Sequence, residues 1–172
     1  MTDDARVLVA YGSKHGATAE IAQAIGDVLA ASGLEVDVRR ARAVHSLEPY
    51  RVVVLGSAVY AGRWRSDAFR LLRRPELRDL DVWLFSSGPV GEESSKDPKQ
   101  TERLTRPPRV EALGASHGVH EHVVFGGMVA EDSGFIRKKM ARRMPAELRD
   151  RRDWNAIAAW AQRISATVTS TV

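Results

Sequence analysis

The sequence predicts an α/β domain built on a doubly wound parallel sheet. Strand and helix patterns alternate along all 172 residues, which is typical of parallel strands joined by crossover helices. The run at 52–55 is apolar on both faces, as expected in the middle of such a sheet. The stretch 7–20 has the pattern of a buried strand, a short loop and a helix. We find no internal repeat and predict a single domain over residues 1–172.

Five apolar segments are predicted to be the strands. Leu34 to Val38 alternates apolar and polar residues, which indicates an edge strand. The connection 41–50 is short for a parallel crossover, but it suffices if it contains a helical turn. The predicted strands cover residues 7–11, 34–38, 52–55, 82–85 and 123–125.

The helices follow from apolar spacing and end signals. Apolar residues recur at helical spacing from Thr18 to Ala31, and Gly33 marks the end of this helix. Three further helices are predicted: one capped by Ser66 or Asp67, a short one from Pro107-Pro108 to Leu113, and a closing helix that begins near Asp153, with Asp150 or Asp153 as its cap.

The loop after the first strand has the composition of an anion site. Unpaired backbone N–H groups converge at the N-terminus of the following helix, where the helix dipole adds roughly half a positive charge. The glycines let the backbone approach a ligand, and the hydroxyls can donate hydrogen bonds. The pattern fits neither a Walker A motif nor a GxGxxG fingerprint, so we expect one terminal phosphate of a small cofactor; the alternative is a tight turn without a ligand. The loop consists of Gly12, Ser13, Lys14, His15, Gly16, Ala17 and Thr18.

Composition narrows the chemistry. The chain has no cysteine, which excludes disulfides, thiol nucleophiles, cysteinyl flavin links and cysteine-ligated iron–sulfur clusters. Neither a signal peptide nor an apolar run near the ~18 residues of a membrane span is visible, so we expect a cytoplasmic protein. The net charge of +4 favours acidic partners or an anionic surface.

The chain resembles the flavodoxin superfamily over nearly its whole length. Three segments at strand ends carry the resemblance: the loop 12–18, Gly56-Ser57-Ala58-Val59-Tyr60-Ala61-Gly62, and Ser86-Ser87-Gly88-Pro89-Val90-Gly91. The resemblance implies a flavodoxin-like three-layer sandwich with five parallel strands in the order 2-1-3-4-5, and FMN as the cofactor.

The same resemblance implies which residues contact FMN. The residues that would surround the phosphate are Ser13, Lys14, His15, Gly16, Ala17 and Thr18. One side of the ring would contact Ala58, Val59, Tyr60, Ala61 and Gly62. The other side would contact Ser86, Ser87, Gly88, Pro89, Val90 and Gly91. Tyr60 would stack on the ring, and Trp64 would either close over the site or pack under the loop.

Within the superfamily, the nearer resemblance is to the menaquinone-dependent protoporphyrinogen IX dehydrogenase type and its uncharacterised relatives. It rests on GSAVYAGRWRSDAF at 56–69 and on Phe125-Gly126-Gly127-Met128 followed by a basic segment. One departure is the stretch 91–118, which is short and lacks the aromatic residues of that group; its run 92–99 is polar enough to be mobile.

Two departures from flavodoxin electron carriers favour an enzyme. The segment 86–91 contains no aromatic residue, so one face of the ring would be open to a substrate. Ala61 stands where carriers often have the glycine that supports one-electron chemistry, and alanine is penalised at positive φ. We therefore expect two-electron chemistry on a quinone-like or porphyrinogen-like molecule. The alternatives are a non-catalytic carrier that serves an acidic redox protein, and an interaction protein that has lost the flavin.

Three other features of the sequence each have two interpretations. One is a run of arginines at 63, 65, 70, 73 and 74, which would attract an anionic partner or simply be solvated. His120 and His122 lie two apart on a predicted strand, but no set of carboxylates or cysteines completes a metal site. The segment 135–144 has the pattern of a basic amphipathic helix, which we expect either to dock by its apolar side or to attach peripherally to the inner face of an anionic membrane. The chain has no nucleic-acid recognition motif.

Overall fold

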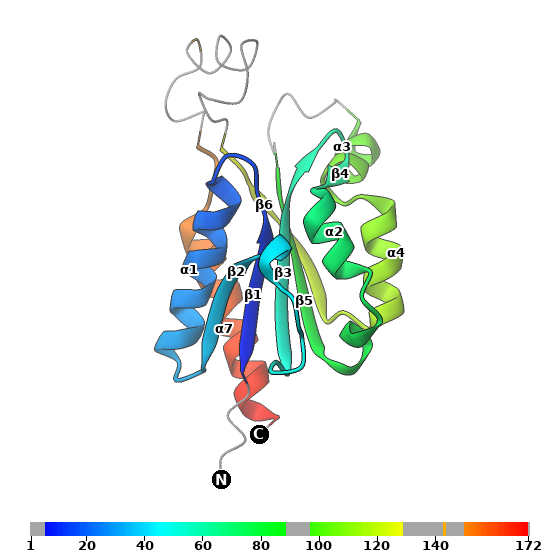
Figure 1. Ribbon diagram of the computed structural model, residues 1–172. Helices are drawn as coiled ribbons and strands as arrows, with labels where there is room; N and C mark the ends of the chain where they lie inside the picture. Colours follow the sequence, from blue (N-terminus) through cyan, green and yellow to red (C-terminus); the bar gives the residue numbers. More distant parts are fainter. Residues whose placement is uncertain (1–5, 89–96, 129–142, 144–149, 172) are drawn as a thin grey trace.

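A parallel β-sheet forms the middle layer of the computed structural model, which describes residues 6–88, 97–128, 143 and 150–171 (Figure 1). The sheet order is β2-β1-β3-β5-β6, and every neighbouring pair in that path is parallel. Counted along the parallel strands alone, this is the expected order 2-1-3-4-5. A short strand, β4, is added antiparallel to β3. The strands are β1 (Val7–Gly12), β2 (Val36–Arg40), β3 (Val52–Tyr60), β4 (Arg63–Trp64), β5 (Asp81–Gly88) and β6 (Glu121–Gly126).

Helices cover both faces of the sheet. In Figure 1, α1 and α7 lie on one side, and α2 and α4 lie on the other. The expected three-layer sandwich is therefore confirmed. The helices are α1 (Ala17–Ala31), α2 (Ser66–Leu72), α3 (Pro98–Thr105), α4 (Pro108–His117) and α7 (Trp154–Ser170), with the short 3-10 helices η1 (Ala41–Ala43) and η2 (Pro75–Asp79).

Each strand divides its side chains between two cores. Successive residues of a strand point to opposite faces. In β1, Val7 and Val9 pack with the residues of α1 and α7, whereas Leu8 and Ala10 pack with those of α2 and the segment around Leu77. All four β1 side chains are fully buried. The sheet is thus held between two apolar layers, which makes its carboxyl edge a rigid support for loops.

Several elements differ from the sequence-based expectation. β3 was predicted to end at Leu55 but continues to Tyr60, because β1 and β5 flank it through Gly56 and Ser57. β5 likewise continues through Gly88, so Ser86 and Ser87 lie in a strand and not in a loop. The helix α3 was not predicted, and the turn expected in 41–50 is η1.

The cap of the last helix is Asp153, one of the two candidates. Its side chain accepts a hydrogen bond from the backbone N–H of Ala156 at 3.0 Å. Asp150 instead binds Arg152. Among the helices of the described residues, none combines the length and apolar character needed to cross a bilayer.

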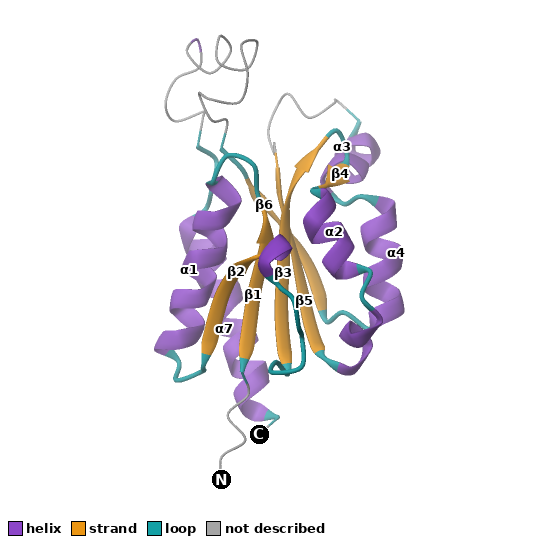
Figure 2. Cartoon of the chain, in the orientation of Figure 1, coloured by secondary structure: helices purple, strands orange, loops and turns teal. Residues whose placement is uncertain are grey.

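The carboxyl ends of β1, β3 and β5 lie at one edge of the sheet, at the top of Figure 2. The N-terminus of α1 and the hairpin between β3 and β4 lie at the same edge. In sheets of this kind ligands bind outside the carboxyl ends of the strands, where the strand order reverses. We therefore expect the functional site at this edge of the sheet.

Candidate functional site

The loop between β1 and α1 is closed by one of its own hydroxyls. The Ser13 Oγ accepts a hydrogen bond from the backbone N–H of Gly16 at 3.0 Å. Gly16 is the N-cap of α1 and has a φ of 92°, a left-handed conformation that favours glycine. No side chain caps the helix, so the amides of its first turn remain available to an anion. The proton of the Ser13 hydroxyl is also free to be donated, because only its oxygen is used within the loop.

The six predicted phosphate contacts surround this helix end. Thr18 is buried in the first turn, Lys14 is exposed, and Ser13, His15, Gly16 and Ala17 are half-buried. A Cβ on Gly12 would lie 2.8 Å from the Cβ of Ala68, so the loop is packed directly against the start of α2. The structure therefore brings the first loop and the segment after β3 together.

The second predicted segment is a hairpin. β3 and β4 pair through Val59 with Trp64 and Tyr60 with Arg63, which leaves a two-residue turn. The turn residues Ala61 and Gly62 have φ values of 48° and 68°. Positive φ at both central positions is the type I′ geometry that matches the twist of a hairpin. Ala61 is the one non-glycine residue with positive φ in the described part of the chain.

Tyr60 joins the hairpin to the first loop. Its ring lies edge-on to the His15 ring, with the centroids 6.4 Å apart, and the Arg65 guanidinium lies 5.9 Å from the Tyr60 centroid. Tyr60 is half-buried and Ala61 is exposed. The aromatic residue predicted to stack on a flavin thus lies at the boundary between the two loops.

The third predicted segment is described only in part. Ser86, Ser87 and Gly88 form the end of β5; β6 pairs with all three, and β3 pairs with Ser86 and Ser87. Pro89, Val90 and Gly91 lie outside the described residues. The Ser86 side chain is fully buried, and its hydroxyl is hydrogen-bonded beneath the hairpin.

That hydroxyl belongs to a chain of polar groups that runs from the buried Trp64 to the exposed Glu111. The Trp64 Nε1 donates to the Ser86 Oγ at 2.8 Å, the Ser86 Oγ lies 2.9 Å from the His122 Nε2, and the His122 Nδ1 contacts the Glu111 carboxylate. Burial lowers the pKa of His122, although the nearby Glu111 carboxylate acts in the opposite direction. Trp64 is only 6% exposed, so of the two roles left open it packs under the loop.

The histidines that suggested a metal have separate partners. His120 stacks on Trp83, with the ring centroids 4.3 Å apart, and its Nε2 lies 2.8 Å from the Asp81 carboxylate. The His117 Nε2 is 2.7 Å from the carbonyl oxygen of Leu72. No group of three or more potential metal ligands occurs among the described residues.

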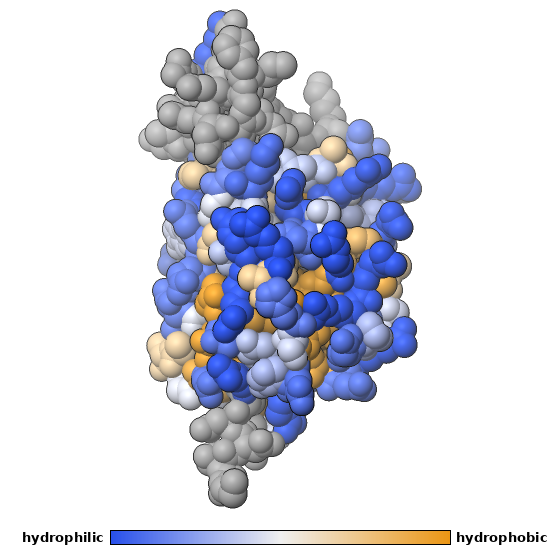
Figure 3. Space-filling view, viewed as in Figure 1, coloured by the Kyte–Doolittle hydropathy of each residue, from blue (hydrophilic) through white to orange (hydrophobic). Residues whose placement is uncertain are grey.

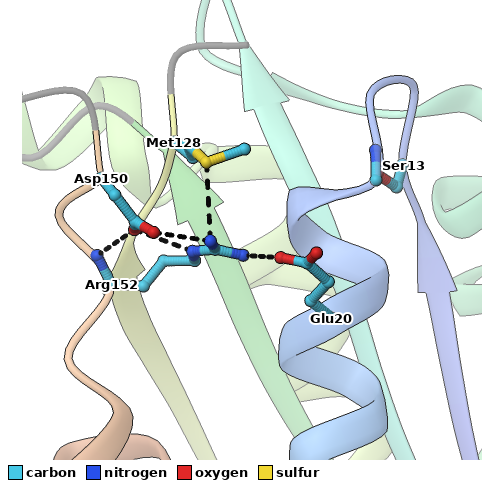
Figure 4. Close-up of polar contacts among 6 residues, drawn as sticks. Ser13, Glu20, Met128, Asp150 and Arg152 are labelled. Atoms are coloured by element: carbon cyan, nitrogen blue, oxygen red, sulfur yellow. Dashed lines mark hydrogen bonds and ion pairs between the residues drawn. The ribbon is translucent and has the colours of Figure 1, made fainter. Parts of the chain in front are cut away.

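A set of polar contacts beside the first loop was not predicted from the sequence; we call its three residues, Arg152, Glu20 and Asp150, the brace. Arg152, whose side chain is 6% exposed, reaches from the segment before α7 to Glu20 in the first turn of α1 (Figure 4). Its Nε and one terminal nitrogen also donate to Asp150 at 2.8 and 2.6 Å. The same terminal nitrogen lies 3.5 Å from the Met128 sulfur, and the guanidinium lies over the Trp154 ring, 4.7 Å from its centroid. The Arg152 hydrogen bonds lower the pKa of Asp150, and Asp150 raises the pKa of Arg152. Glu20 and Arg152 are 132 positions apart, and no local pattern links them.

Comparisons with known proteins place this geometry in a family. A family model described as a flavodoxin domain matches residues 8–153. A comparison with curated proteins gave no match.

Solved structures share the fold. The flavodoxin of Streptococcus pneumoniae TIGR4 superposes with a TM-score of 0.62 at 18% identity and covers 95% of this chain and 99% of its own. Flavodoxin 2 of Bacillus cereus gives 0.55 at 23% identity, with 81% and 94% covered. The rubredoxin oxygen:oxidoreductase of Desulfovibrio gigas gives 0.62 at 15% identity; 96% of this chain is covered, but only 36% of that enzyme.

The residues of the first loop fit the cofactor that such domains bind. A phosphate needs donors and positive charge, and the loop offers uncapped amides, the Ser13 and Thr18 hydroxyls and the Lys14 ammonium. The Tyr60 ring supplies an aromatic surface next to this donor set. The predicted cofactor, FMN, and a redox function are what a flavodoxin domain implies. With 146 of its residues covered by the family model, this chain belongs to the flavodoxin domain family.

Proposed function

We propose that this chain is an FMN-dependent oxidoreductase that transfers two electrons to or from an anionic, quinone-like or porphyrinogen-like small molecule. FMN supplies the hydride and electron chemistry. The chain would hold the phosphate with the first loop, hold the ring with Tyr60 and the ends of β3 and β5, and attract the substrate to the surrounding surface.

The observation that supports an anionic substrate is the positive charge beside the β3–β4 hairpin. The segments 63–70 and 97–109 hold seven lysines and arginines against three acidic residues, a net charge of +4, which equals that of the whole chain. These segments are neighbours: the carbonyl oxygen of Arg103 lies 3.6 Å from where a Cβ on Gly62 would be, and Arg109 lies over the Phe69 ring. Within the described residues, Arg106 is the one cation of this set that forms an ion pair. Hydrophilic side chains cover most of the face seen in Figure 3.

Excess positive charge around a site favours the approach of anions. A porphyrinogen-like substrate carries carboxylates, and a quinone bearing a carboxylate would serve as its simplest substitute. Of the residues described at the end of β5, none is aromatic, which leaves room for a flat substrate. We call the two segments 63–70 and 97–109 the basic rim.

Cofactor binding is tested first. Titration of FMN into the flavin-free protein, followed by flavin fluorescence, should give a saturable site. Replacing Ser13 and Thr18 together by alanine should weaken it at least tenfold, because two hydroxyl donors to a charged phosphate are lost. A protein that binds no FMN, or a double variant with unchanged affinity, would refute the proposal at its base.

The substrate class is tested with reduced, FMN-loaded protein. We expect a carboxylated naphthoquinone to reoxidise the wild type faster than its uncharged analogue. The charge reversals Arg63→Glu and Arg103→Glu should slow the carboxylated compound only, and more at low salt. Arg78→Glu, on the exposed η2 at the amino end of β5, is the matched control. If Arg78→Glu slows the carboxylated compound as much as Arg63→Glu and Arg103→Glu do, the charge of the basic rim does not select the substrate.

The second candidate is a carrier that exchanges single electrons with an acidic redox protein. The same basic rim would attract such a partner. Stepwise reduction of the loaded protein separates the two: accumulation of a one-electron-reduced form favours the carrier, and direct passage to the fully reduced form favours the enzyme. Peripheral membrane contact also stays a prediction, since the segment 135–144 lies outside the described residues apart from position 143.

A further inference from the structure

Ser86, His122 and Glu111 have the spacing of a nucleophile, a base and an orienting acid. The Ser86 Oγ is 2.9 Å from one ring nitrogen of His122, and the Glu111 carboxylate contacts the other. In hydrolases this geometry activates the serine. Here Ser86 has no exposed surface, and its oxygen already accepts the Trp64 N–H at 2.8 Å. No substrate carbonyl can reach the hydroxyl, so the arrangement needs another explanation.

The hydrogen bonds of these groups run in a single direction. The Trp64 Nε1 can only donate, so the Ser86 Oγ is its acceptor, and the single Ser86 proton goes to the His122 Nε2. The His122 Nδ1 then carries a proton and donates it to Glu111. Every group is satisfied when His122 is neutral and protonated on Nδ1. We call these four residues, Trp64, Ser86, His122 and Glu111, the relay.

Protonation of His122 breaks this pattern. The protonated Nε2 must donate to the Ser86 Oγ, and the Ser86 proton is then left without an acceptor. Among the described residues, the Ser86 Oγ contacts only Trp64 and His122. A buried donor without a partner is costly, so the relay is stable only around a neutral imidazole.

The relay ends on the hairpin that carries the predicted ring contacts. Trp64 is one of the two residues of β4, and it pairs with Val59 next to Tyr60. A second bond, from the Arg65 N–H to the Ser57 Oγ at 2.9 Å, holds the far side of β4. The Trp64 ring also lies edge-on to His122, with the centroids 5.9 Å apart. Any rearrangement of His122 and Ser86 therefore acts on the backbone next to Tyr60.

We propose that His122 is a positioning residue for the flavin: as a neutral imidazole it holds Trp64 and the β3–β4 hairpin in the binding arrangement, and its protonation releases them. This inference rests on the proposed binding of FMN. The charged groups that face His122 in the described residues are Glu111 on α4 and Arg106 after α3. Burial lowers the pKa of His122, and this supports a neutral ring at pH 7.

The test is the pH dependence of flavin affinity. We expect the dissociation constant of the wild type to rise about tenfold more between pH 8 and pH 5 than that of His122→Gln, whose carboxamide oxygen can accept the Ser86 proton but cannot titrate. The flavin phosphate titrates near pH 6, but its contribution is the same in the two proteins. Riboflavin, which has no phosphate, should show the same difference between them.

A second variant separates positioning from a merely structural role. Glu111→Gln removes the carboxylate that raises the pKa of His122, so the acid loss of flavin affinity should move to lower pH without disappearing. Thermal unfolding of each variant at pH 8 verifies the fold. If the wild type binds FMN with the same pH profile as His122→Gln, the inference is overturned while the proposed function stands. If the wild type binds no FMN at any pH, the proposed function itself fails.

Discussion

The turn between β3 and β4 contains a residue whose type conflicts with its backbone. Ala61 has a φ of 48°, and it is exposed, so its methyl group gains little from packing. The left-handed conformation costs an alanine roughly 1–2 kcal/mol. Asparagine tolerates this conformation, and Asn-Gly is a preferred pair for a type I′ turn. Because Gly62 already follows, Ala61→Asn creates that pair.

We therefore expect Ala61→Asn to raise the free energy of unfolding by about 1 kcal/mol. For a domain of this size the melting temperature should rise by about 3 °C. Gly62→Ala is the matched control. Its Cβ would meet the Arg103 carbonyl oxygen at 3.6 Å and the Leu104 Cδ2 at 3.7 Å, which are ordinary contacts, so its cost is that of the backbone at φ 68° alone.

Chemical denaturation of both variants measures the two free energies on one scale. Gly62→Ala should lose about 1–2 kcal/mol while Ala61→Asn gains. The reasoning is refuted if the two variants shift stability in the same direction, because opposite signs follow only from positive φ at both positions of this turn.

Three further predictions concern the fold and the brace. Gly56→Ala should destabilise by about 3 kcal/mol, since its Cβ would lie 2.0–2.3 Å from three atoms of the buried Phe85 ring, and Phe85→Leu should recover part of the loss in urea denaturation. Asp150→Asn should cost about 0.5 kcal/mol at pH 7, because the Asp150 side chain is 38% exposed and solvent weakens its pair with Arg152. Since Arg152 lowers the pKa of the folded carboxyl, this stability is present above about pH 3.9 and is lost as the pH falls through the folded pKa, so the two proteins should converge in acid. In a double-mutant cycle, Arg152→Met and Glu20→Gln should couple by about 0.5–1 kcal/mol, because Glu20 is 62% exposed; zero coupling would mean that the pair does not stabilise α1.

Elements with a strong local period could be predicted from the sequence. The helix expected at 18–31 is observed at Ala17–Ala31, because its apolar stripe and Gly33 are both local signals. The sequence predicts the end of β3 at Leu55, because Gly56 and Ser57 interrupt the apolar run, whereas the strand continues to Tyr60. Their place in the strand depends on the Phe85 ring, which fills the space above Gly56, and this is a contact between strands.

The start of α3 carries a local sequence signal for a helix N-terminus, an Asp-Pro pair. Asp97 caps it by accepting a hydrogen bond from the Lys99 N–H at 3.0 Å, and Pro98 takes the first helical position. An Asp-Pro pair is a recognised helix start. The polar composition of the run 92–99 predicts a mobile stretch, and α3 begins inside this run at Pro98.

The candidate site divides in the same way. The three segments at the strand ends could be identified from the sequence, because their glycines and hydroxyls stand next to apolar runs. The relay and the brace could not, because they join residues that are distant in the chain. Ser86 and His122, for example, are 36 positions apart and meet only because β5 and β6 pair in register.

In the proposed binding of FMN, the brace and the relay act on different ends of the flavin, so their effects can be separated. The brace holds the first turn of α1, where Glu20 lies two residues beyond Thr18, so its loss affects the phosphate end. Without Arg152, the carboxylates of Glu20 and Asp150 also lose the cation that balances them near a dianion. The relay holds the hairpin, so its loss affects the ring end. Arg152→Met should therefore weaken FMN several-fold more than riboflavin, whereas Ser86→Ala should weaken both flavins equally. If the two variants affect both flavins alike, the supports do not act on separate ends of the site.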